Sequence, residues 1–302
     1  MRFAKMHGLG NNYVYVNLWD ERLAPQQLAP LARAVADVST GIGSDGLITI
    51  GPSDAADARM RIFNADGSEG QTCGNGLRCV GKYLYDKGLV RETHLSVETG
   101  AGVARLQLHL DAAGETVWEV TVDMGVPRLR RMDLPVLGGP GDQEALADTV
   151  TVGRDSYTFT GVSMGNPHAV IFVDDVGAVD VAAVGPMIER HDLFPERVNV
   201  EFVAAKGPEE LDFRVWERGS GITQACGSGA CAAVVASALT GRTKRGAQVV
   251  VHLLGGDLSI RYDESGHVFM RGPAAWICEG VWMGEGAATM GIGTGAVTGR
   301  AQ

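Results

Sequence analysis

Asn64-Ala65-Asp66-Gly67-Ser68 leads to Cys73-Gly74-Asn75-Gly76 in the first half of this chain, and Glu217-Arg218-Gly219-Ser220 leads to Cys226-Gly227-Ser228-Gly229 in the second half. In both segments a polar residue lies nine positions before the cysteine, and a Gly-Ser pair and a Cys-Gly-x-Gly turn occur in the same order. Each segment follows a strand-like run and precedes a helical run. This repetition is typical of a duplicated domain, so the sequence predicts two similar domains.

The helical runs after the two cysteines predict one central helix for each domain. Residues 230–239 are apolar on every side and are followed by Gly241, which is typical of a buried helix that ends at glycine. Residues 77–85 form a second helical run that ends at Gly88. Strand-like runs occur around both, at residues 13–16, 47–50, 59–63, 117–122, 169–173, 211–215, 249–253 and 258–262. We therefore predict an α/β fold of the α+β type, with two pseudo-symmetric domains whose strands wrap around a central helix.

Length and composition limit the class of protein. A chain of 302 residues exceeds what one hydrophobic core usually organises, which again favours two domains. Its 45% apolar and 21% charged residues are typical of a globular protein. The formal net charge of -10 disfavours nucleic acid and anionic membranes as partners, because both require basic surfaces. A small-molecule substrate is the expected partner, and an anionic one must meet a local cation.

Cysteine usage and hydropathy indicate the compartment. The first residues lack the apolar run of a secretory signal, and no stretch reaches the length of a membrane span. The five cysteines are odd in number and sparse, which favours reduced thiols, so we expect a cytoplasmic protein. Cys79, Cys231 and Cys278 are interpreted as small buried apolar residues.

Cys73 and Cys226 are the predicted reactive groups, because each lies among glycines at the start of a helical run. Free N–H groups and the helix dipole stabilise negative charge there, so we expect the pKa of both thiols to fall below its usual value of about 8.5. The same N–H groups can bind a carboxylate. If the two loops face each other, one thiolate removes the α-proton of an amino acid and the other thiol delivers a proton from the opposite side.

We expect neither a metal nor another cofactor. The cysteines at 73 and 79 do not have zinc-ligand spacing, those at 226 and 231 only reach its edge, and no histidine cluster completes either pair. The glycine-rich loop at residues 41–46 lacks the lysine of a phosphate-binding loop, and we find no pyridoxal or dinucleotide signature.

Several motifs resemble the diaminopimelate epimerase family, whose members interconvert LL- and meso-diaminopimelate on the bacterial route to lysine and cell-wall peptide. The resemblance runs from Phe3 to about Gly284. The motifs are Gly8-Leu9-Gly10-Asn11, Phe63-Asn64-Ala65-Asp66-Gly67-Ser68, Cys73-Gly74-Asn75-Gly76-Leu77-Arg78, Met164-Gly165-Asn166-Pro167-His168, Val198-Asn199-Val200-Glu201-Phe202, and Trp216-Glu217-Arg218-Gly219 followed by Ala225-Cys226-Gly227-Ser228-Gly229.

The resemblance implies a role for each matching residue. Cys73 and Cys226 would be the acid/base pair, and His168 and Glu217 would assist the thiols. Asn11, Asn64, Asn166, Asn199 and Arg218 would hold the distal amino and carboxylate groups of the substrate, and Gly74, Asn75, Gly227 and Ser228 would bind the reacting carboxylate. Glu217 would also contact the substrate.

The resemblance also implies the domain organisation. The N-terminal domain would span residues 1–126 and the C-terminal domain residues 127–267, with a last strand at about 268–284 that returns to the first domain. The glycine-rich residues 285–302 predict a flexible tail. Members of the family generally form homodimers, with each active site between the two domains.

Two other functions stay open. Relatives with the same twin-cysteine fold act as racemases or epimerases of other amino acids, such as proline, hydroxyproline or histidine. Arg218 favours diaminopimelate among these, because a distal carboxylate needs a cation. From a different class, the chain could be a thiol-redox or ligand-binding protein whose cysteines form a reversible disulfide.

Overall fold

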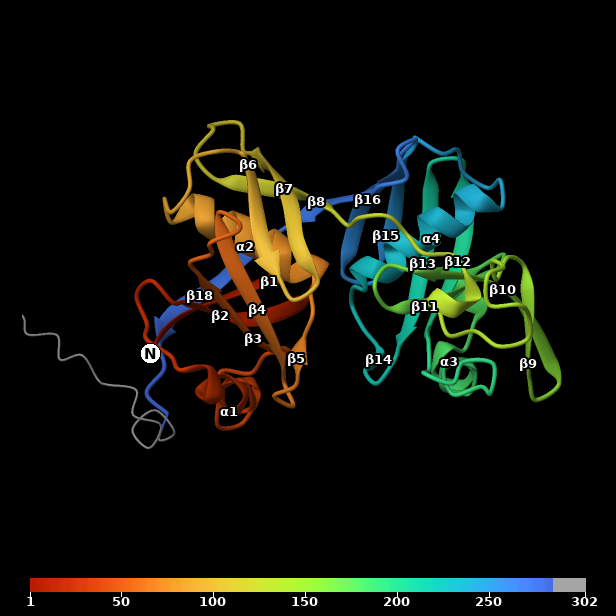
Figure 1. The fold of residues 1–302 in the computed structure, drawn as a ribbon, viewed down its shortest axis with the longest axis horizontal. Helices are drawn as coiled ribbons and strands as arrows, with labels where there is room; N and C mark the ends of the chain where they lie inside the picture. Colours follow the sequence, from red (N-terminus) through yellow and green to blue (C-terminus); the bar gives the residue numbers. More distant parts are fainter. Residues whose placement is uncertain (285–302) are drawn as a thin grey trace, which may run out of the picture.

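The computed structural model describes residues 1–284 and contains two strand-rich halves that lie side by side (Figure 1). Each half has one long helix surrounded by strands: α2 (Gly74–Asp86) in the first half and α4 (Gly227–Leu239) in the second. The predicted fold class, with its two central helices, is confirmed. The tail predicted at residues 285–302 lies outside the described residues.

The strands of the first half form one mixed sheet around α2. β1 pairs antiparallel with β2, β2 parallel with β3, and β3 antiparallel with β4. β4 pairs antiparallel with β5 and parallel with β6, and antiparallel pairs then join β6 to β7 and β7 to β8. The elements are β1 (Arg2–Gly8), β2 (Asn11–Asn17), α1 (Pro25–Ala36), β3 (Gly46–Gly51), β4 (Ala58–Asn64), β5 (Glu69–Gly70), β6 (His94–Thr99), β7 (Gly102–Leu110) and β8 (Val117–Asp123).

The second half repeats this pairing order strand by strand. β10, β11, β12, β13, β14, β15 and β16 take the places of β1 to β7, with the same parallel and antiparallel relations. A duplication therefore accounts for the topology as well as for the repeated cysteine loops. The elements are η1 (Arg131–Asp133), β9 (Asp148–Val152), β10 (Asp155–Ser163), β11 (Pro167–Phe172), η2 (Val176–Ala178), α3 (Val181–Glu189), β12 (Asn199–Gly207), β13 (Glu210–Glu217), β14 (Gly221–Ile222), β15 (Gln248–Leu253) and β16 (Gly256–Tyr262).

β17 (Val268–Pro273) joins the two halves, because it pairs antiparallel with β16 of the second half and with β8 of the first. β18 (Ala275–Val281) then pairs antiparallel with β1, as β9 pairs with β10 in the second half. The chain first passes from the first half to the second after β8, before the isolated β-bridge that pairs Arg128 with Ser163 of β10. The domain limits expected from the sequence, 1–126 with 268–284 and 127–267, stay a proposal that these two crossings support.

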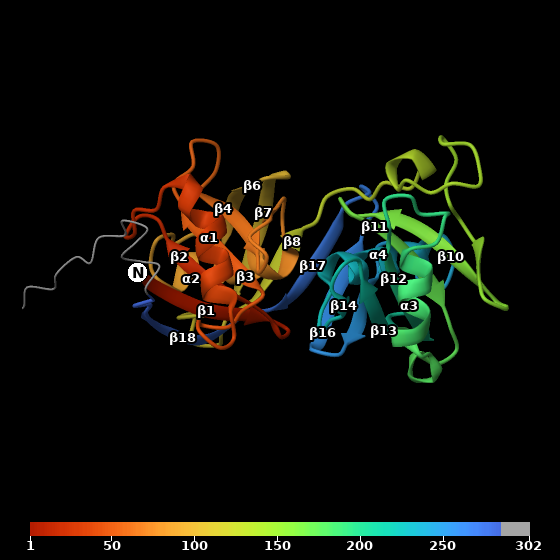
Figure 2. The same ribbon diagram turned by 90° about the horizontal axis from the view of Figure 1, so that it is seen from below.

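Helices α1 and α3 are absent from the sequence prediction. Both lie on the same face of the molecule, one in each half (Figure 2). Each contains an internal proline, Pro30 or Pro186, and proline usually argues against a helix interior. Tertiary packing overrides that preference in α1, where Leu28, Leu31 and Val35 are buried in an apolar cluster with β2, β3 and β4.

The central helix of the second half is as apolar as predicted, since residues 229–237 are all buried. Cys79 and Cys231 are fully buried in the central helices, which confirms their interpretation as core residues. The same interpretation is wrong for Cys278, which is exposed. Cys278 lies on β18, which among the described strands pairs only with β1. None of the helices within residues 1–284 has the length and apolar character needed to cross a bilayer.

Candidate active site

Cys73 and Cys226 occupy the same structural position in the two halves. Cys73 is the N-cap of α2 and Cys226 is the N-cap of α4, and both have extended backbone geometry. Each sulfur accepts a hydrogen bond at 3.4 Å from the backbone N–H three residues later, that of Gly76 or Gly229. The predicted position of both thiols at a helix N-terminus is confirmed.

The glycine that follows each cysteine lies close to one side chain of β17. A Cβ at Gly74 would lie 2.7 Å from Met270 Cε, and a Cβ at Gly227 would lie 3.0 Å from Met270 Sδ. Met270 belongs to the strand that both halves share. The N-termini of α2 and α4 therefore meet at the junction of the halves.

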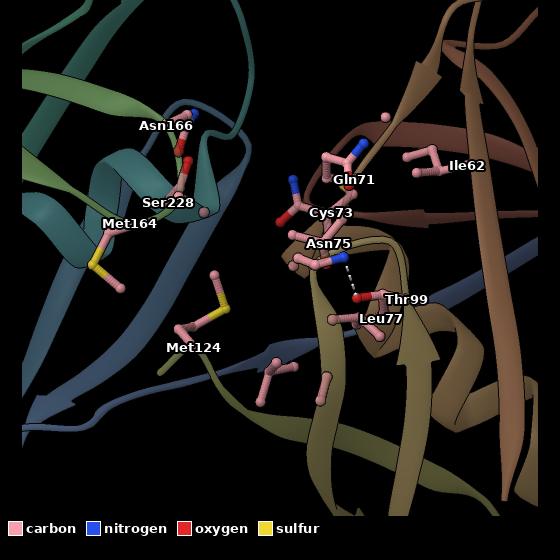
Figure 3. A pocket seen from close by; sticks show the side chains of 18 of the residues that line it. Ile62, Gln71, Cys73, Asn75, Leu77, Thr99, Met124, Met164, Asn166 and Ser228 are labelled. Atoms are coloured by element: carbon pink, nitrogen blue, oxygen red, sulfur yellow. Dashed lines mark hydrogen bonds between the residues drawn. The ribbon is translucent and has the colours of Figure 1, made fainter. Parts of the chain in front are cut away.

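A cavity of about 680 Å³ lies at this junction, and its volume is in the range typical of small-molecule sites. In Figure 3, Cys73 and Asn75 lie on one wall, and Asn166 and Ser228 lie on the facing wall. The predicted site residues that line the cavity are Asn11, Asn64, Cys73, Gly74, Asn75, Asn166, Glu217, Arg218, Cys226, Gly227 and Ser228. His168 and Asn199 are buried and are not among its lining residues.

The side-chain amide of Asn75 connects the two cysteine loops. Its Nδ2 donates to Asn11 Oδ1 at 3.3 Å and to the Ala225 carbonyl at 3.1 Å. The Cys73 thiol donates to the same Asn11 oxygen at 3.7 Å. Ala225 directly precedes Cys226, and Asn11 contacts Cys73. The Asn75 amide therefore links the Cys73 loop to the Cys226 loop.

His168 forms a buried pair with Glu201, a residue to which the sequence assigned no role. His168 Nδ1 lies 2.6 Å from Glu201 Oε1, and both side chains are fully buried. The other ring nitrogen, Nε2, lies 3.0 Å from Oδ1 of the cavity residue Asn166. His168 therefore stands behind the cavity wall and contacts a residue of that wall.

Burial raises the pKa of both thiols, which is contrary to the sequence prediction. For Cys73 the charge of Arg78 and the N–H groups at the helix start oppose this rise only in part. The pKa of Cys226 is raised well above its usual value by burial and then by the charges of Glu217 and Glu201. The helix terminus acts in the predicted direction, but loss of hydration outweighs it.

Glu217 lies beside Cys226 on the cavity wall. Its carboxyl accepts a hydrogen bond from Thr223 Oγ1. Burial raises the pKa of the Glu217 carboxyl, and the hydrogen bond from Thr223 is the largest effect that opposes the rise. Its position agrees with the expected influence on the protonation of Cys226, which stays a prediction.

Arg218 is exposed at the cavity, and hydrogen bonds to the protein hold both its backbone and its side chain. Its backbone N–H donates to Asn199 Oδ1 at 2.9 Å, and its Nη1 donates to the Glu196 carbonyl at 2.9 Å. Asn199 Nδ2 donates to the Pro167 carbonyl at 2.9 Å. Both polar groups of the Asn199 side chain are therefore engaged with the protein, and its contact with substrate stays a prediction.

Two buried carboxylates support the site and were missed at the sequence level. Glu201 lies under Cys226, and Glu189 accepts hydrogen bonds from Trp216 Nε1 at 2.8 Å and from the Gly219 N–H at 3.3 Å. Glu189 thus holds the Trp216 side chain on one side of the Glu217-Arg218 pair and the Gly219 backbone on the other. The sequence did carry a signal for Glu201, because it is the one charged residue within the otherwise apolar run at residues 200–205.

The fold is shared with solved racemase and epimerase structures. A hydroxyproline epimerase from Agrobacterium vitis aligns with a TM-score of 0.68 at 15% identity, over 93% of this chain and 90% of that chain. A probable proline racemase from Agrobacterium radiobacter K84 aligns with a TM-score of 0.68 at 14% identity, over 93% of this chain and 92% of that chain. This likeness places the chain in the class of proteins that have this two-halved fold.

Sequence similarity narrows this class to one family. The diaminopimelate epimerase family matches residues 3–130 and 160–277. The diaminopimelate epimerase of Bacillus cereus (strain ATCC 10987 / NRS 248) is 52% identical over 280 residues, which cover 93% of this chain and 96% of that protein. The Bacillus anthracis enzyme of the same name is also 52% identical over 280 residues, with the same coverage of both chains. This chain belongs to the diaminopimelate epimerase family and is an isomerase.

Proposed function

We propose that this chain interconverts LL- and meso-diaminopimelate by proton transfer between two cysteines and the α-carbon, without a cofactor. The observation that carries the proposal is that two thiols cap two helices whose N-termini meet at one cavity. One thiolate takes the α-proton, and the electron pair of the broken C–H bond stays on the α-carbon. The opposite thiol then donates its proton to the other face of that carbon, which inverts the centre and leaves a thiolate on the second sulfur.

The two helix starts would stabilise the charge that develops during this transfer. Removal of the α-proton places negative charge next to the substrate carboxylate, and N–H groups at a helix N-terminus are suitable donors for it. We assign the reacting carboxylate to Gly74, Asn75, Gly227 and Ser228, all of which line the cavity. Donors from both helices would then hold the carbon between the two sulfurs.

The distal end of the substrate is assigned to other polar groups that line the same cavity. Asn64, Asn166 and Arg218 would bind the distal carboxylate, and Glu217 would face the distal ammonium group. A guanidinium binds a carboxylate as a forked pair of hydrogen bonds. Proline and hydroxyproline have no such distal groups, so this end of the cavity favours diaminopimelate over both.

The function is tested by incubating the reduced protein with LL-diaminopimelate in deuterated water. We expect meso product that carries deuterium at the inverted α-carbon. Proline, 4-hydroxyproline and histidine form the comparison panel, and faster inversion of any of these would assign the chain to another amino acid. Thiol oxidation and reduction without any change in substrate stereochemistry would instead favour a redox protein.

Arg218→Lys is expected to lower kcat/KM for diaminopimelate by about tenfold or more, mainly through KM. Lysine keeps the charge but loses the fork, and a hydrogen bond to a charged group contributes about 1.5–3 kcal/mol. Arg128→Lys is the matched control, because Arg128 is another exposed cation that lines the same cavity. Steady-state kinetics should show the loss for Arg218 alone; equal losses for both variants would contradict the assignment.

We also propose that the protein is a cytoplasmic homodimer. Support for the compartment comes from the five cysteines, which are all unpaired in the structure. Support for the dimer comes from the resemblance to the family. Light scattering on the purified protein would give twice the chain mass of 31.8 kDa for the expected state.

A further inference from the structure

Arg78 has a completely buried guanidinium whose partners are all uncharged. Its Nε donates to the Pro273 carbonyl at 3.0 Å, and its Nη1 donates to Asn75 Oδ1 at 3.0 Å and lies 3.8 Å from Met270 Sδ. Its Nη2 has no hydrogen-bond partner among the described residues. The full positive charge of this side chain is therefore uncompensated in the interior of the protein.

Such a placement is costly, which distinguishes Arg78 from a residue kept for stability. An unpaired buried cation loses its hydration without gaining a counter-charge. Arg78 also lies in the second turn of α2, close to the helix end that favours anions. Lys82, one turn further along the same helix, is compensated: its Nζ lies 2.8 Å from Asp86 Oδ2 and donates to the Val117 carbonyl at 2.6 Å.

The neighbours of Arg78 connect it to both cysteine loops. It holds the oxygen of the Asn75 amide, and the nitrogen of that amide donates to Asn11 and to the carbonyl before Cys226. The Cys73 thiol donates to the same oxygen of Asn11. The close fit extends to Gly8, where a Cβ would lie 2.6 Å from the guanidinium Nη2. Few conformations of the arginine satisfy these contacts together.

We propose that Arg78 is a positioning residue for the two-cysteine site: it fixes the Asn75 amide between the loops, and its charge favours a thiolate at Cys73 over one at Cys226. This inference rests on the proposed function. A thiolate on Cys73, or the negative charge that develops on the substrate, supplies the counter-charge that the guanidinium lacks. In the resting protein, Cys73 is then the thiol that loses its proton more readily and acts as the base.

The electrostatic surroundings of the two thiols differ in the direction that this proposal requires. Besides Arg78, the groups that act on Cys73 are the phenols of Tyr13 and Tyr15 on β2, the thiol of Cys79 on α2 and the carboxyl of Glu217 on β13. The charge of Arg78 lowers the pKa of Cys73 against the effect of burial. Cys226 instead faces Glu217 and Glu201, which both raise its pKa. The cation Arg78 thus acts on the Cys73 thiol, and the carboxylates of Glu217 and Glu201 act mainly on the Cys226 thiol.

The test is the rate of iodoacetamide alkylation of Cys73 as a function of pH, followed by mass spectrometry of the reduced full-length protein. Arg78→Met keeps most of the side-chain volume without the charge. We expect the pKa of Cys73 to rise, which slows alkylation at about pH 7.5 by roughly tenfold or more. Arg78→Lys, which keeps the charge, should recover most of that rate.

Lys82→Gln is the matched control, because it removes a buried cation from the same helix one turn further from Cys73; its alkylation profile should not change. Thermal unfolding followed by circular dichroism establishes that each variant is folded, and Arg78→Gln replaces Arg78→Met if the latter does not fold. An unchanged Cys73 profile in the folded, uncharged variant overturns the proposal. The assay uses no substrate, so its outcome is separate from that of the epimerisation test.

Discussion

Replacing Cys73 or Cys226 with serine is expected to lower kcat/KM for diaminopimelate epimerisation by about 10³-fold, since proton transfer by a positioned group contributes about 10²- to 10⁴-fold. Both variants should lose activity to a similar extent, because one inversion needs a base on one face of the carbon and an acid on the other. Serine is the better first substitution. Each sulfur caps a helix, and a hydroxyl keeps an acceptor for the N–H three residues later.

Alanine at the same positions separates the helix cap from the chemistry. Cys73→Ala and Cys226→Ala should be inactive as well, and each should in addition lose about 0.5–2 kcal/mol of stability with the cap. Cys278→Ser is the control for thiol removal in general, because Cys278 is exposed on β18, and it should keep full activity. Steady-state kinetics with either serine variant at the wild-type rate would exclude the two-cysteine mechanism.

Isotope exchange extends this result to each thiol separately. In Cys226→Ser, the remaining Cys73 thiolate should still exchange the α-hydrogen of the one isomer that presents it to Cys73, without inverting the centre. Cys73→Ser should show the same behaviour with the other isomer. Proton NMR in deuterated water measures both, and exchange of the same isomer by the two variants would contradict a facing pair.

Local features of the fold followed from the sequence, whereas distant contacts did not. The repeated loops and the helix N-caps at Cys73 and Cys226 are encoded within a few residues, so their pattern predicts them. The pair of His168 with Glu201 joins residues 33 positions apart, and the contact of Asn75 with Ala225 joins residues 150 positions apart. Contacts at such separations depend on how the halves pack, which periodicity does not report.

The error in the thiol pKa has the same origin. The helix terminus is a local property, and its effect on Cys73 has the expected sign. The amount of water that the surrounding strands exclude is a tertiary property, and it has the larger effect. Burial likewise explains the error at Cys278, because the sequence does not reveal which face of β18 is covered.

A large loss of stability is expected when the buried pair of His168 and Glu201 behind Cys226 is broken. The first half of the molecule shows which substitutions can test this. Strand register makes Tyr13 the equivalent of His168, and Ile48 the equivalent of Glu201. A Cβ at Gly76 would lie 2.7 Å from Ile48 Cδ1. A Cβ at Gly229, the equivalent position in the second half, would lie 2.8 Å from Glu201 Oε1. The same structural positions therefore hold an uncharged pair, Tyr13 and Ile48, in one half and the hydrogen-bonded pair of His168 and Glu201 in the other.

His168→Tyr alone leaves the Glu201 carboxylate buried without its partner, and we expect the free energy of unfolding to fall by about 3–5 kcal/mol. Glu201→Ile alone leaves one ring nitrogen of His168 unpaired and should cost about 1–3 kcal/mol. The double variant copies the uncharged pair of the first half. Since replacing both partners of a buried hydrogen-bonded pair by uncharged groups of similar shape can be nearly neutral, its stability should lie within about 1 kcal/mol of the wild type.

Urea unfolding of the four proteins gives the coupling energy between the two side chains as a double-mutant cycle. Costs that add to within about 0.5 kcal/mol would mean that the pair is not coupled and would contradict the prediction. The double variant also separates stability from chemistry. Because the charge of Glu201 raises the pKa of Cys226, its removal should make alkylation of that thiol faster even where the stability is restored. A restored fold with an unchanged Cys226 profile would limit the pair to a structural role.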